Sequence, residues 1–472
     1  MNRLRARVRA HHRRVALGAP DPSLTPNAGL AAISELIDHL DMTGVLDAAI
    51  GSVKQRDRGT TGAEVLASLA SCQLAGGDHL VSLDRLRADA AGQELLRAPT
   101  PASTTAAGIA RRFTPPHLAG IETGIATLNQ RVLDQVGQVR RTSLLREVTL
   151  DIDATDVEVY GRAKQGCAFN YQGQRAYRAD IAFWAELGVP VAADLLSGND
   201  DPRASVVVLL RRALACLPEG VGTVRVRMDA GYFAGQIARE CLFRGVRFAI
   251  GATRNPVLWR AAAAIPEHAW APAIGMEHGE VAVCDYVPDW WPADTVCLVR
   301  RVRIPVEAVS ADPRARRRRT IPKGQLALAL QGKLDHVYGY SFILTNMDVT
   351  SEEKIAWVEW WYRHRTDIEA LNRDAKHGAA VRHLPSGDLA VNTVWMWGAL
   401  LAAALSAWLQ ELTGIDRGNG RGRRTIARLR RELIGVPGRV VHHARNVELR
   451  LPPGPQLLTI VLARLRALPR SG

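Results

Sequence analysis

Residues 350–378 constrain the fold more than any other stretch, because their pattern predicts one long helix. Thr350 and Glu353 fit a T-x-x-E capping box, which satisfies two backbone amide donors at the start of a helix. Gly378 follows two basic residues, as is typical where a helix ends in a left-handed cap. At ~1.5 Å per residue this rod is roughly 40 Å long, about the depth of a domain, so the other elements must pack around it.

Four polar residues of this stretch share one helical face. Their spacings of three, four and seven residues place them within ~60° of one another, and they are Tyr362, Arg365, Glu369 and Lys376. A phenol, a guanidinium, a carboxylate and an ammonium on one stripe suit a site that handles metal ions and phosphate. A solvated face with ordinary intrahelical ion pairs is the alternative interpretation.

Acidic residues also occur in two segments whose alternation predicts β-strands. In LDIDATDVEV, Asp151 and Asp153 are two residues apart, so both point to the same face of a strand. Asp229 follows the strand-like run VRVRM. Because sites in open α/β sheets form at strand ends, we expect two of these carboxylates to meet Glu369 on the crossing helix.

Three carboxylates a few ångströms apart repel one another, so a divalent cation is required to hold them together. Oxygen ligands without a His or Cys set favour Mg²⁺ or Mn²⁺. Two such ions ~4 Å apart activate a water or a 3′-hydroxyl and stabilise the leaving oxygen of an in-line phosphoryl displacement. Lys376 and Arg365 would then bind phosphates beside the cleavage point, and Tyr362 would hydrogen-bond or stack there.

The charge of the chain indicates a polyanionic partner. Its 472 residues carry a formal net charge of +14, and only six of the 61 basic residues are lysines. Arginine binds phosphate bidentately, although a GC-rich genome gives the same bias without functional meaning. Counterion release makes nucleic acid the expected partner of so basic a chain.

Cysteine usage and hydropathy predict a cytosolic protein. The six cysteines are scattered without a C-x-x-C pair, which is typical of reduced thiols. The N-terminal run MNRLRARVRAHHRR is basic but lacks the apolar core of a signal peptide. Residues 389–409 contain no charge, and we interpret them as a buried core helix in preference to a membrane span. We therefore expect no contact with a membrane.

Helical and strand-like patterns occur in blocks, which predicts an α/β core with additions at both ends and one insertion. Short helices joined by Gly and Pro turns near the N-terminus fit either a helix-turn-helix-like DNA reader or a plain helical scaffold. The expected division is a basic disordered arm (1–20), a helical DNA-binding domain (21–143), the first part of the core (144–253), a β-rich insertion (254–348), the second part of the core with the catalytic helix (349–412) and a basic C-terminal region (413–472).

Taken together, these motifs resemble the DDE transposases of bacterial insertion sequences, in the group marked by a Y-x2-R-x3-E-x6-K signature. The stripe on the long helix matches that spacing in full, and the similarity covers roughly residues 150–380. The segments LDIDATDVEVYG, LLSGND and RMDAGYF resemble the family's first and second aspartate regions. The resemblance implies a ribonuclease H-like fold with a β-rich insertion between the second aspartate and the glutamate.

By this resemblance Asp153, Asp229 and Glu369 are the catalytic residues and the ligands of two Mg²⁺ or Mn²⁺ ions. The choice of Asp153 rests on the D-x-T step that it forms with Thr155, and Asp151 remains the alternative. Related enzymes cut at transposon ends, form and reopen a hairpin, and join the 3′-hydroxyl to target DNA.

The leading hypothesis is a cut-and-paste DNA transposase that acts in the cytoplasm, associated with the nucleoid. Its partners would be double-stranded DNA, both terminal inverted repeats and target, bound by a homodimer or a larger synaptic complex. The alternatives are a ribonuclease H-fold nuclease without strand transfer and a catalytically inactive DNA-binding regulator. The repeat sequence, the target site and the oligomeric state are not encoded in any motif found here.

Overall fold

The structure, a computed structural model, describes residues 16–54, 58–315, 317–415, 422–444, 446–454 and 456–469. Most of the expected basic arm, residues 1–15, lies outside these ranges. The described part of the arm, from residue 16 onward, is exposed and without regular structure up to residue 20.

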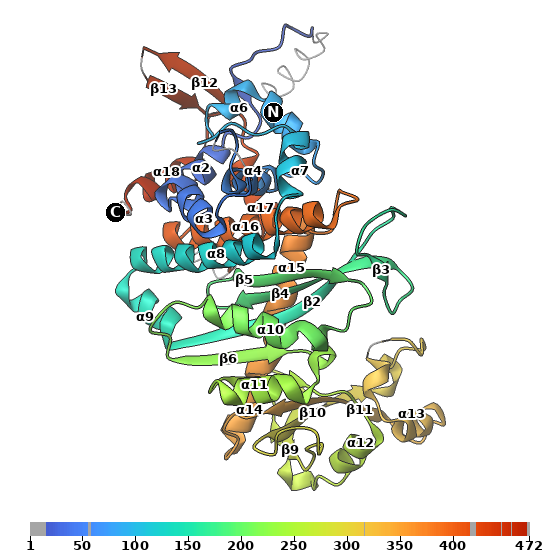
Figure 1. Ribbon diagram of the computed structural model, residues 1–472. Coiled ribbons are helices and arrows are strands. Elements are labelled where there is room, and N and C mark those ends of the chain that lie inside the picture. Colours follow the sequence, from blue (N-terminus) through green and yellow to red (C-terminus); the bar gives the residue numbers. More distant parts are fainter. Residues whose placement is uncertain are drawn as a thin grey trace, which may run out of the picture.

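A ten-stranded mixed sheet occupies the centre of the molecule (Figure 1). β2 pairs antiparallel with β4 and parallel with β6, and β4 pairs in turn with β5 and with the short β3. β6 and β7 are parallel, as is usual for strands joined by a helix. The bounds confirm the two strands predicted above, which are β2 Glu147–Glu158 and β6 Thr223–Met228. Their neighbours are β3 Ala168–Phe169, β4 Arg175–Trp184, β5 Val189–Ser197 and β7 Arg247–Gly251.

The strands between residues 254 and 348 extend this same sheet. β7 pairs antiparallel with β11, after which β10, β9 and β8 follow in order. Residues predicted to form an insertion are therefore continuous with the sheet that carries the aspartates. The elements of this region are α12 Pro256–Ala263, β8 Ala271–Pro272, β9 Gly279–Cys284, β10 Val296–Pro305, α13 Lys323–Leu330 and β11 His336–Thr345.

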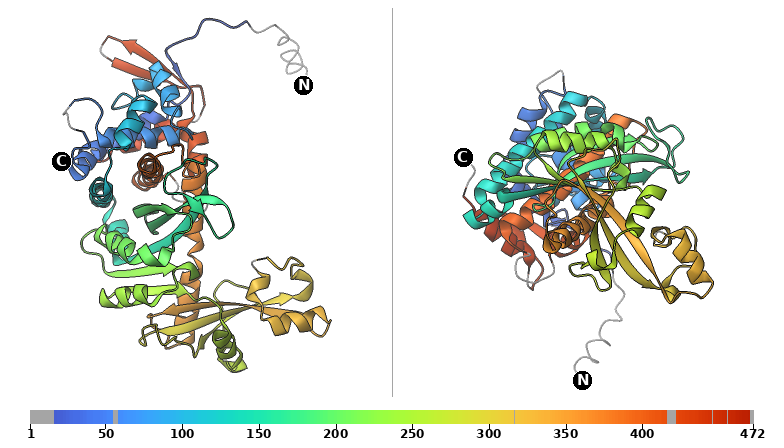
Figure 2. Two further views of the ribbon diagram at one scale, coloured as in Figure 1. Left: turned by 45° about the vertical axis from the view of Figure 1, so that its right-hand side comes forward. Right: turned by 90° about the horizontal axis from the view of Figure 1, so that it is seen from below.

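Helices cover both faces of the sheet. α10 (Pro202–Ala215) and α11 (Gly235–Phe243) connect the parallel strands and pack against one face, where Arg212 of α10 pairs with Asp194 of β5. The residues after β11 cross the opposite face, where Trp361 contacts Arg227. Figure 2 shows this crossing segment in orange, running past the strands from the helical end of the molecule to the insertion.

The predicted single helix over residues 350–378 is wrong in its continuity. The structure divides it into α14 (Glu352–Arg363), α15 (Thr366–Arg373) and a π-helical turn at Asp374–Gly378. At the break the amide of Arg365 donates to Tyr362 O, three residues back, where an α-helix donates four residues back.

Both predicted caps of this segment also shift. Thr350 turns its hydroxyl and its amide to Asp348, so Ser351 becomes the N-cap and accepts from the amide of Lys354. The left-handed residue near the other end is Ala380, with φ 64°, in place of Gly378. Gly378 is needed for space, because a Cβ there would lie 2.8 Å from Cβ of Ile426.

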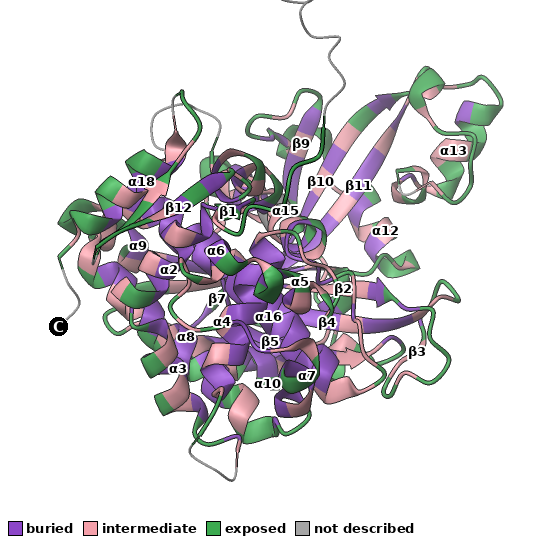
Figure 3. Ribbon diagram, turned by 90° about the horizontal axis from the view of Figure 1, so that it is seen from above, coloured by how far each residue is buried: buried purple, intermediate pink, exposed green. Residues whose placement is uncertain are grey.

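The N-terminal region is helical, and Thr61 and Glu64 form a capping box at the start of one of its helices, α4. Its helices are α2 Leu30–His39, α3 Met42–Ile50, α4 Gly62–Leu74, α5 Ser82–Ala88, α6 Ala90–Gln93, α7 Ser103–Ala110, α8 Pro115–Gln135 and α9 Gln138–Arg146. They pack around α16 (Leu389–Thr413), which also contacts β5 of the sheet. Figure 3 shows α16 as buried along its length.

The charge-free run is thus a core helix, as predicted. α16 is long and apolar enough to cross a membrane by composition, but 83% of its most apolar window is buried inside the protein. Two of its three tryptophans are hydrogen-bonded: Trp395 Nε1 donates to Ala380 O and Trp408 Nε1 donates to Asn129 Oδ1. The buried Nε1 of Trp397 has no acceptor among the described residues. The six cysteines are free thiols, five of them buried.

The C-terminal region packs beside the N-terminal region. The short β1 (Leu24–Thr25) pairs with β12 (Gly438–His443), which forms a hairpin with β13 (Asn446–Arg450). α17 (Ile426–Leu429), a π-helical turn at Arg430–Ile434 and α18 (Leu457–Arg466) complete this region. One hydrophobic cluster includes buried residues from both ends, from Ala28 to Leu465.

Gly29 tests the contact between the two ends of the chain. In a Gly29→Ala variant the new Cβ would lie 1.9 Å from Leu433 O, so α2 and the C-terminal turn would be forced apart. We expect a loss of about 1–3 kcal/mol in stability, measured as a lower Tm in thermal unfolding. Gly108→Ala in α7 is the control, because its Cβ meets nothing within 4 Å. An equal fall in Tm for both variants would contradict this packing.

Candidate active site

Asp151 takes part in an internal ion pair. Its side chain is fully buried, and Arg227 donates to both of its oxygens from Nε and Nη2 at 2.7 Å each. A third donor of Arg227, Nη1, reaches Trp361 O at 2.6 Å. Burial raises the pKa of Asp151, and the guanidinium of Arg227 opposes that rise. Asp151 therefore joins β2 to β6 and to the end of α14.

Asp153 lies two residues further along β2, on the same face. Its Oδ2 accepts from Asn372 Nδ2 at 2.9 Å, and its Oδ1 accepts from Arg365 Nη1 at 3.3 Å. Burial raises the pKa of Asp153 to about 6; the charge of Arg365 opposes this rise, and those of Asp229 and Glu369 add to it. The mutual influence of these charges shows that the three predicted carboxylates share one region.

Arg365 connects Asp153 to Glu369. Its Nη2 lies 3.7 Å from Glu369 Oε1, and the Arg365 side chain is 11% exposed while that of Glu369 is 49% exposed. Among the described residues, Asp153, Asp229 and Glu369 do not form a group whose ligand atoms all lie within 4.8 Å of one another. The guanidinium of Arg365 thus offsets negative charge between two separated carboxylates.

Asp229 stands directly after β6. Its side chain caps the 3₁₀ turn Ala230–Tyr232 by accepting from the amide of Gly231 at 2.8 Å. Asp229, Asp153 and Lys376 line one cavity of about 1000 Å³, which opens beside the loop between β2 and β4. Two of the predicted carboxylates and the predicted lysine therefore face a common space.

Tyr362 and Lys376 bind the ends of the two strands that carry the aspartates. The Tyr362 hydroxyl donates to Met228 O at 3.1 Å, next to Asp229, and burial raises the pKa of Tyr362 to about 12. Lys376 Nζ donates to Thr155 Oγ1 at 3.0 Å and to Asp156 O at 2.5 Å, near the end of β2. Tyr362, Arg365 and Lys376 of the predicted stripe therefore contact the sheet, whereas Glu369 is half exposed and pairs with Arg365.

Sequence reasoning missed two residues that support this arrangement. Asn372, which binds Asp153, lies three residues after Glu369 and four before Lys376, so it belongs to the same helical stripe and could have been found by spacing. Arg227 lies two residues before Asp229 and opposite Asp151 in the parallel register, which became visible only once the strands were paired.

A third missed residue, Asp180, lies beneath the cavity on the other face of the sheet. Burial raises the pKa of Asp180 to about 7, and neither of its carboxylate oxygens accepts a hydrogen bond from the described residues. Tyr232 lines the cavity, and its buried hydroxyl also has no hydrogen-bond partner among the described residues. In the sequence, the position of Asp180 inside the apolar run ADIAFW was the one signal that could have indicated a buried acidic residue.

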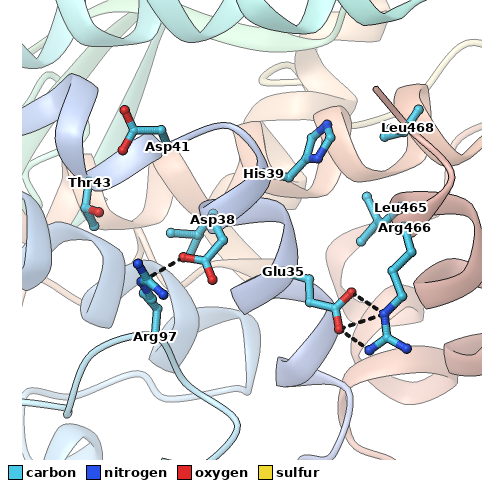
Figure 4. A pocket seen from close by; sticks show the side chains of 10 residues that line it. Glu35, Asp38, His39, Asp41, Thr43, Arg97, Leu465, Arg466 and Leu468 are labelled. Carbon is cyan, nitrogen blue, oxygen red and sulfur yellow. Dashed lines mark hydrogen bonds and ion pairs between the residues drawn. The ribbon is translucent and has the colours of Figure 1, made fainter. Parts of the chain in front are cut away.

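A second cavity, of about 620 Å³, lies at the helical end of the molecule. Figure 4 shows its walls, where Asp38 faces Arg97 and Glu35 faces Arg466 across ion pairs. No residue of β2, β6 or α15 lines it. Its remaining acidic lining residue, Asp41, pairs with Arg131, so these charges are balanced and give no positive surface for a polyanion, and the catalytic candidates remain at the sheet.

Comparison with known proteins identifies the family. A family model described as "Transposase DDE domain group 1" matches residues 9–470. The chain belongs to this family of DDE transposases. It is a DNA transposase, and the match confirms the predicted membership of the DDE transposases.

The transposase was also compared with curated proteins and with solved structures. No curated protein matches it. Among solved structures it is similar to a piggyBac transposase, seen by cryo-EM in a synaptic complex with hairpin DNA, at 11% identity and a TM-score of 0.37; the aligned part covers 86% of this chain and 79% of that chain.

Separate substitutions of Asp151 and Asp153 distinguish their roles in the transposase. Asp151→Ala leaves Arg227 buried without its partner, so we expect a loss of roughly 3–5 kcal/mol and a much lower Tm. Asp153→Asn keeps a group that can bind Arg365 or Asn372, so we expect a near-normal Tm and loss of DNA cleavage. A stable Asp151→Ala variant with full activity would contradict the structural role given to Asp151.

Asp180 predicts a pH dependence of stability. Because folding raises its pKa, the folded state holds a proton between about pH 4 and pH 7 that the unfolded state has lost, and stability falls as pH rises through that range. Asp180→Asn removes this titration. We expect the Tm of the variant, minus that of the wild type, to increase between pH 5 and pH 8 in EDTA. A difference independent of pH would show that Asp180 does not titrate there.

Proposed function

We propose that the transposase cuts DNA at the terminal inverted repeats of its own element and joins the freed 3′ ends to target DNA by a cut-and-paste route. Asp153, Asp229 and Glu369 are the catalytic residues in this proposal. The observation that carries it is the position of Arg365, whose guanidinium lies between the carboxylates of Asp153 and Glu369 beside the cavity that Asp229 also lines.

The donor set fits two Mg²⁺ or Mn²⁺ ions. All three side chains are carboxylates, which these ions prefer as ligands, and the raised pKa of Asp153 reflects a burial cost that nearby positive charge offsets. When bound, the ions would supply activation of the attacking oxygen and stabilisation of the leaving oxygen. Asp153, Asp229 and Glu369 are the residues that would hold them.

The remaining residues of the stripe have distinct roles in this proposal. Arg365 is a planar cation suited to a phosphate next to the scissile bond. Tyr362 is a positioning residue, since its hydroxyl holds the Met228 carbonyl next to Asp229. Lys376 lines the cavity wall and fixes the end of β2, so it contributes both positive charge for the DNA backbone and support for Asp153.

We infer that the strand order β5-β4-β2-β6-β7 represents a ribonuclease H-like core. Three antiparallel strands followed by two parallel ones, with helices on both faces, support this interpretation. The proposed division keeps the predicted ranges: a helical DNA-binding domain at 21–143, the core at 144–253 and 349–412, the β-rich insertion at 254–348 and a basic region at 413–472.

The proposed partner is double-stranded DNA, bound in a homodimer or a larger synaptic complex. The net charge of +14 supports a polyanionic partner. With α16 buried inside the protein, the chain would act in the cytoplasm, on DNA of the nucleoid.

A strand-transfer assay tests the proposal. A duplex carrying the repeats that flank the gene, pre-cut at its 3′ end, is incubated with target plasmid and Mg²⁺. Joined product supports the transposition route. Hydrolysis without joining would favour a ribonuclease H-fold nuclease, and DNA binding without either reaction would favour an inactive regulator.

Glu369→Gln tests the proposed cluster. Glu369 is half exposed and its ion pair with Arg365 is 3.7 Å long, so the substitution should leave the Tm unchanged. We expect Mg²⁺-dependent cleavage to fall by at least ~10³-fold, as for loss of a group that acts in the transition state, while binding in a gel-shift assay persists. Glu353→Gln, at the exposed start of α14, is the matched control. Cleavage at the wild-type rate would exclude Glu369 from the mechanism.

A further inference from the structure

Three side chains with metal-ligand chemistry meet far from the carboxylate cluster. Asp78 and His79 stand in the turn between α4 and α5, and His383 stands in the loop between the π-helical turn and α16. Their ligand atoms all lie within 4.8 Å of one another, and within the described ranges they are the one group of three His, Cys, Asp or Glu residues with this property. The proposed transposition chemistry uses none of them.

The carboxylate of Asp78 lies between the two imidazoles. Asp78 Oδ1 is 2.8 Å from His79 Nδ1, and Asp78 Oδ2 is 3.9 Å from His383 Nε2. The two rings have centroids 5.2 Å apart and are tilted by 57°. In a tetrahedral site with bonds of about 2.0–2.1 Å the ligand atoms lie roughly 3.3 Å apart, so the present spacing needs only small side-chain movements to enclose an ion.

The ligand types select the ion. Two imidazole nitrogens and one carboxylate form a set suited to Zn²⁺, whereas Mg²⁺ prefers oxygen ligands alone. The side chains of Asp78, His79 and His383 are 45%, 57% and 33% exposed. Solvent therefore reaches the site, and water can take the fourth position of a tetrahedral ion.

The side chain of Arg430 already holds the two segments together. It donates to Gln73 O and Leu74 O at the end of α4, and also to Gly378 O at the end of the π-helical turn. Within the second segment, the amide of Arg382 donates to Lys376 O. The ligands are therefore held near one another before any ion binds, which lowers the entropy cost of binding.

We propose that Asp78, His79 and His383 bind one Zn²⁺ or a similar divalent transition-metal ion, which fastens the N-terminal helices to the loop that follows Lys376. The ion is structural. It stabilises the folded state by mass action, because the unfolded chain separates His383 from the other two ligands. His383 follows Lys376, which binds the end of β2, by seven residues, so an ion would fasten the chain just beyond the predicted stripe.

The test uses the full-length protein without DNA, so its outcome does not depend on the proposed transposition chemistry. Protein stripped with EDTA and returned to metal-free buffer with excess Mg²⁺ is titrated with ZnCl₂ by calorimetry, and its Tm is measured with and without Zn²⁺. We expect one Zn²⁺ per chain, a higher Tm with Zn²⁺, and no such rise with further Mg²⁺.

Substitutions assign the binding to these residues. We expect His383→Ala and Asp78→Asn each to lose the saturable Zn²⁺ binding and the rise in Tm, while their metal-free Tm stays at the metal-free wild-type value. His336→Ala is the matched control, because His336 also pairs with a neighbouring Asp but belongs to no such group of three among the described residues. Absence of saturable binding in the wild type, or undiminished binding in both variants, would overturn the proposal.

Discussion

The buried ion pair between Asp151 and Arg227 is the interaction on which the site depends. It joins two neighbouring strands at the centre of the sheet, and the remaining donor of Arg227 binds the carbonyl of Trp361. The residue after Trp361 is Tyr362, the first residue of the predicted stripe. A pair of this kind adds little net stability over an apolar contact, but it is costly to break and defines one geometry. The guanidinium of Arg227 therefore sets the start of the stripe against the sheet, and Arg365 and Lys376 add further contacts along it.

Asp151 and Asp153 lie on one face of β2 but differ in their neighbours and exposure, and we assign them different roles. Asp151 is enclosed and neutralised by Arg227, whereas Asp153, two residues on, is bound by Arg365 and Asn372 beside an open cavity. Glu369 is more exposed again. From Asp151 to Asp153 to Glu369 the carboxylates become more exposed and so freer to exchange partners, as the binding of ions and a phosphodiester would require. Without bound ions, the guanidinium of Arg365 lowers the repulsion between Asp153 and Glu369.

The sequence predicted the strands, the core helix and the side chains that gather at the site, because each rests on a local period or a fixed spacing. It failed where neighbours that are distant in the chain decide the outcome. The helix break at Arg365 and the left-handed Ala380 have no strong local signal. The roles of Arg227 and Asp180 depend on strand register, and the close packing of Gly29 on Leu433 depends on the two ends meeting. Periodicity describes faces of elements, but it does not identify which faces come together.

The joining of both ends of the chain in one core has a consequence for synthesis. The N-terminal helices pack around α16, and β1 pairs with a strand near the other end of the chain. Most domains fold on the ribosome as they emerge, and the first helices have one another as partners, as where α3 packs on α4 and α8. Their contacts with α16 and β12, however, form only when the last part of the chain follows, after a wait on the order of tens of seconds. A nascent chain therefore completes this core only once its C-terminal hairpin has been made.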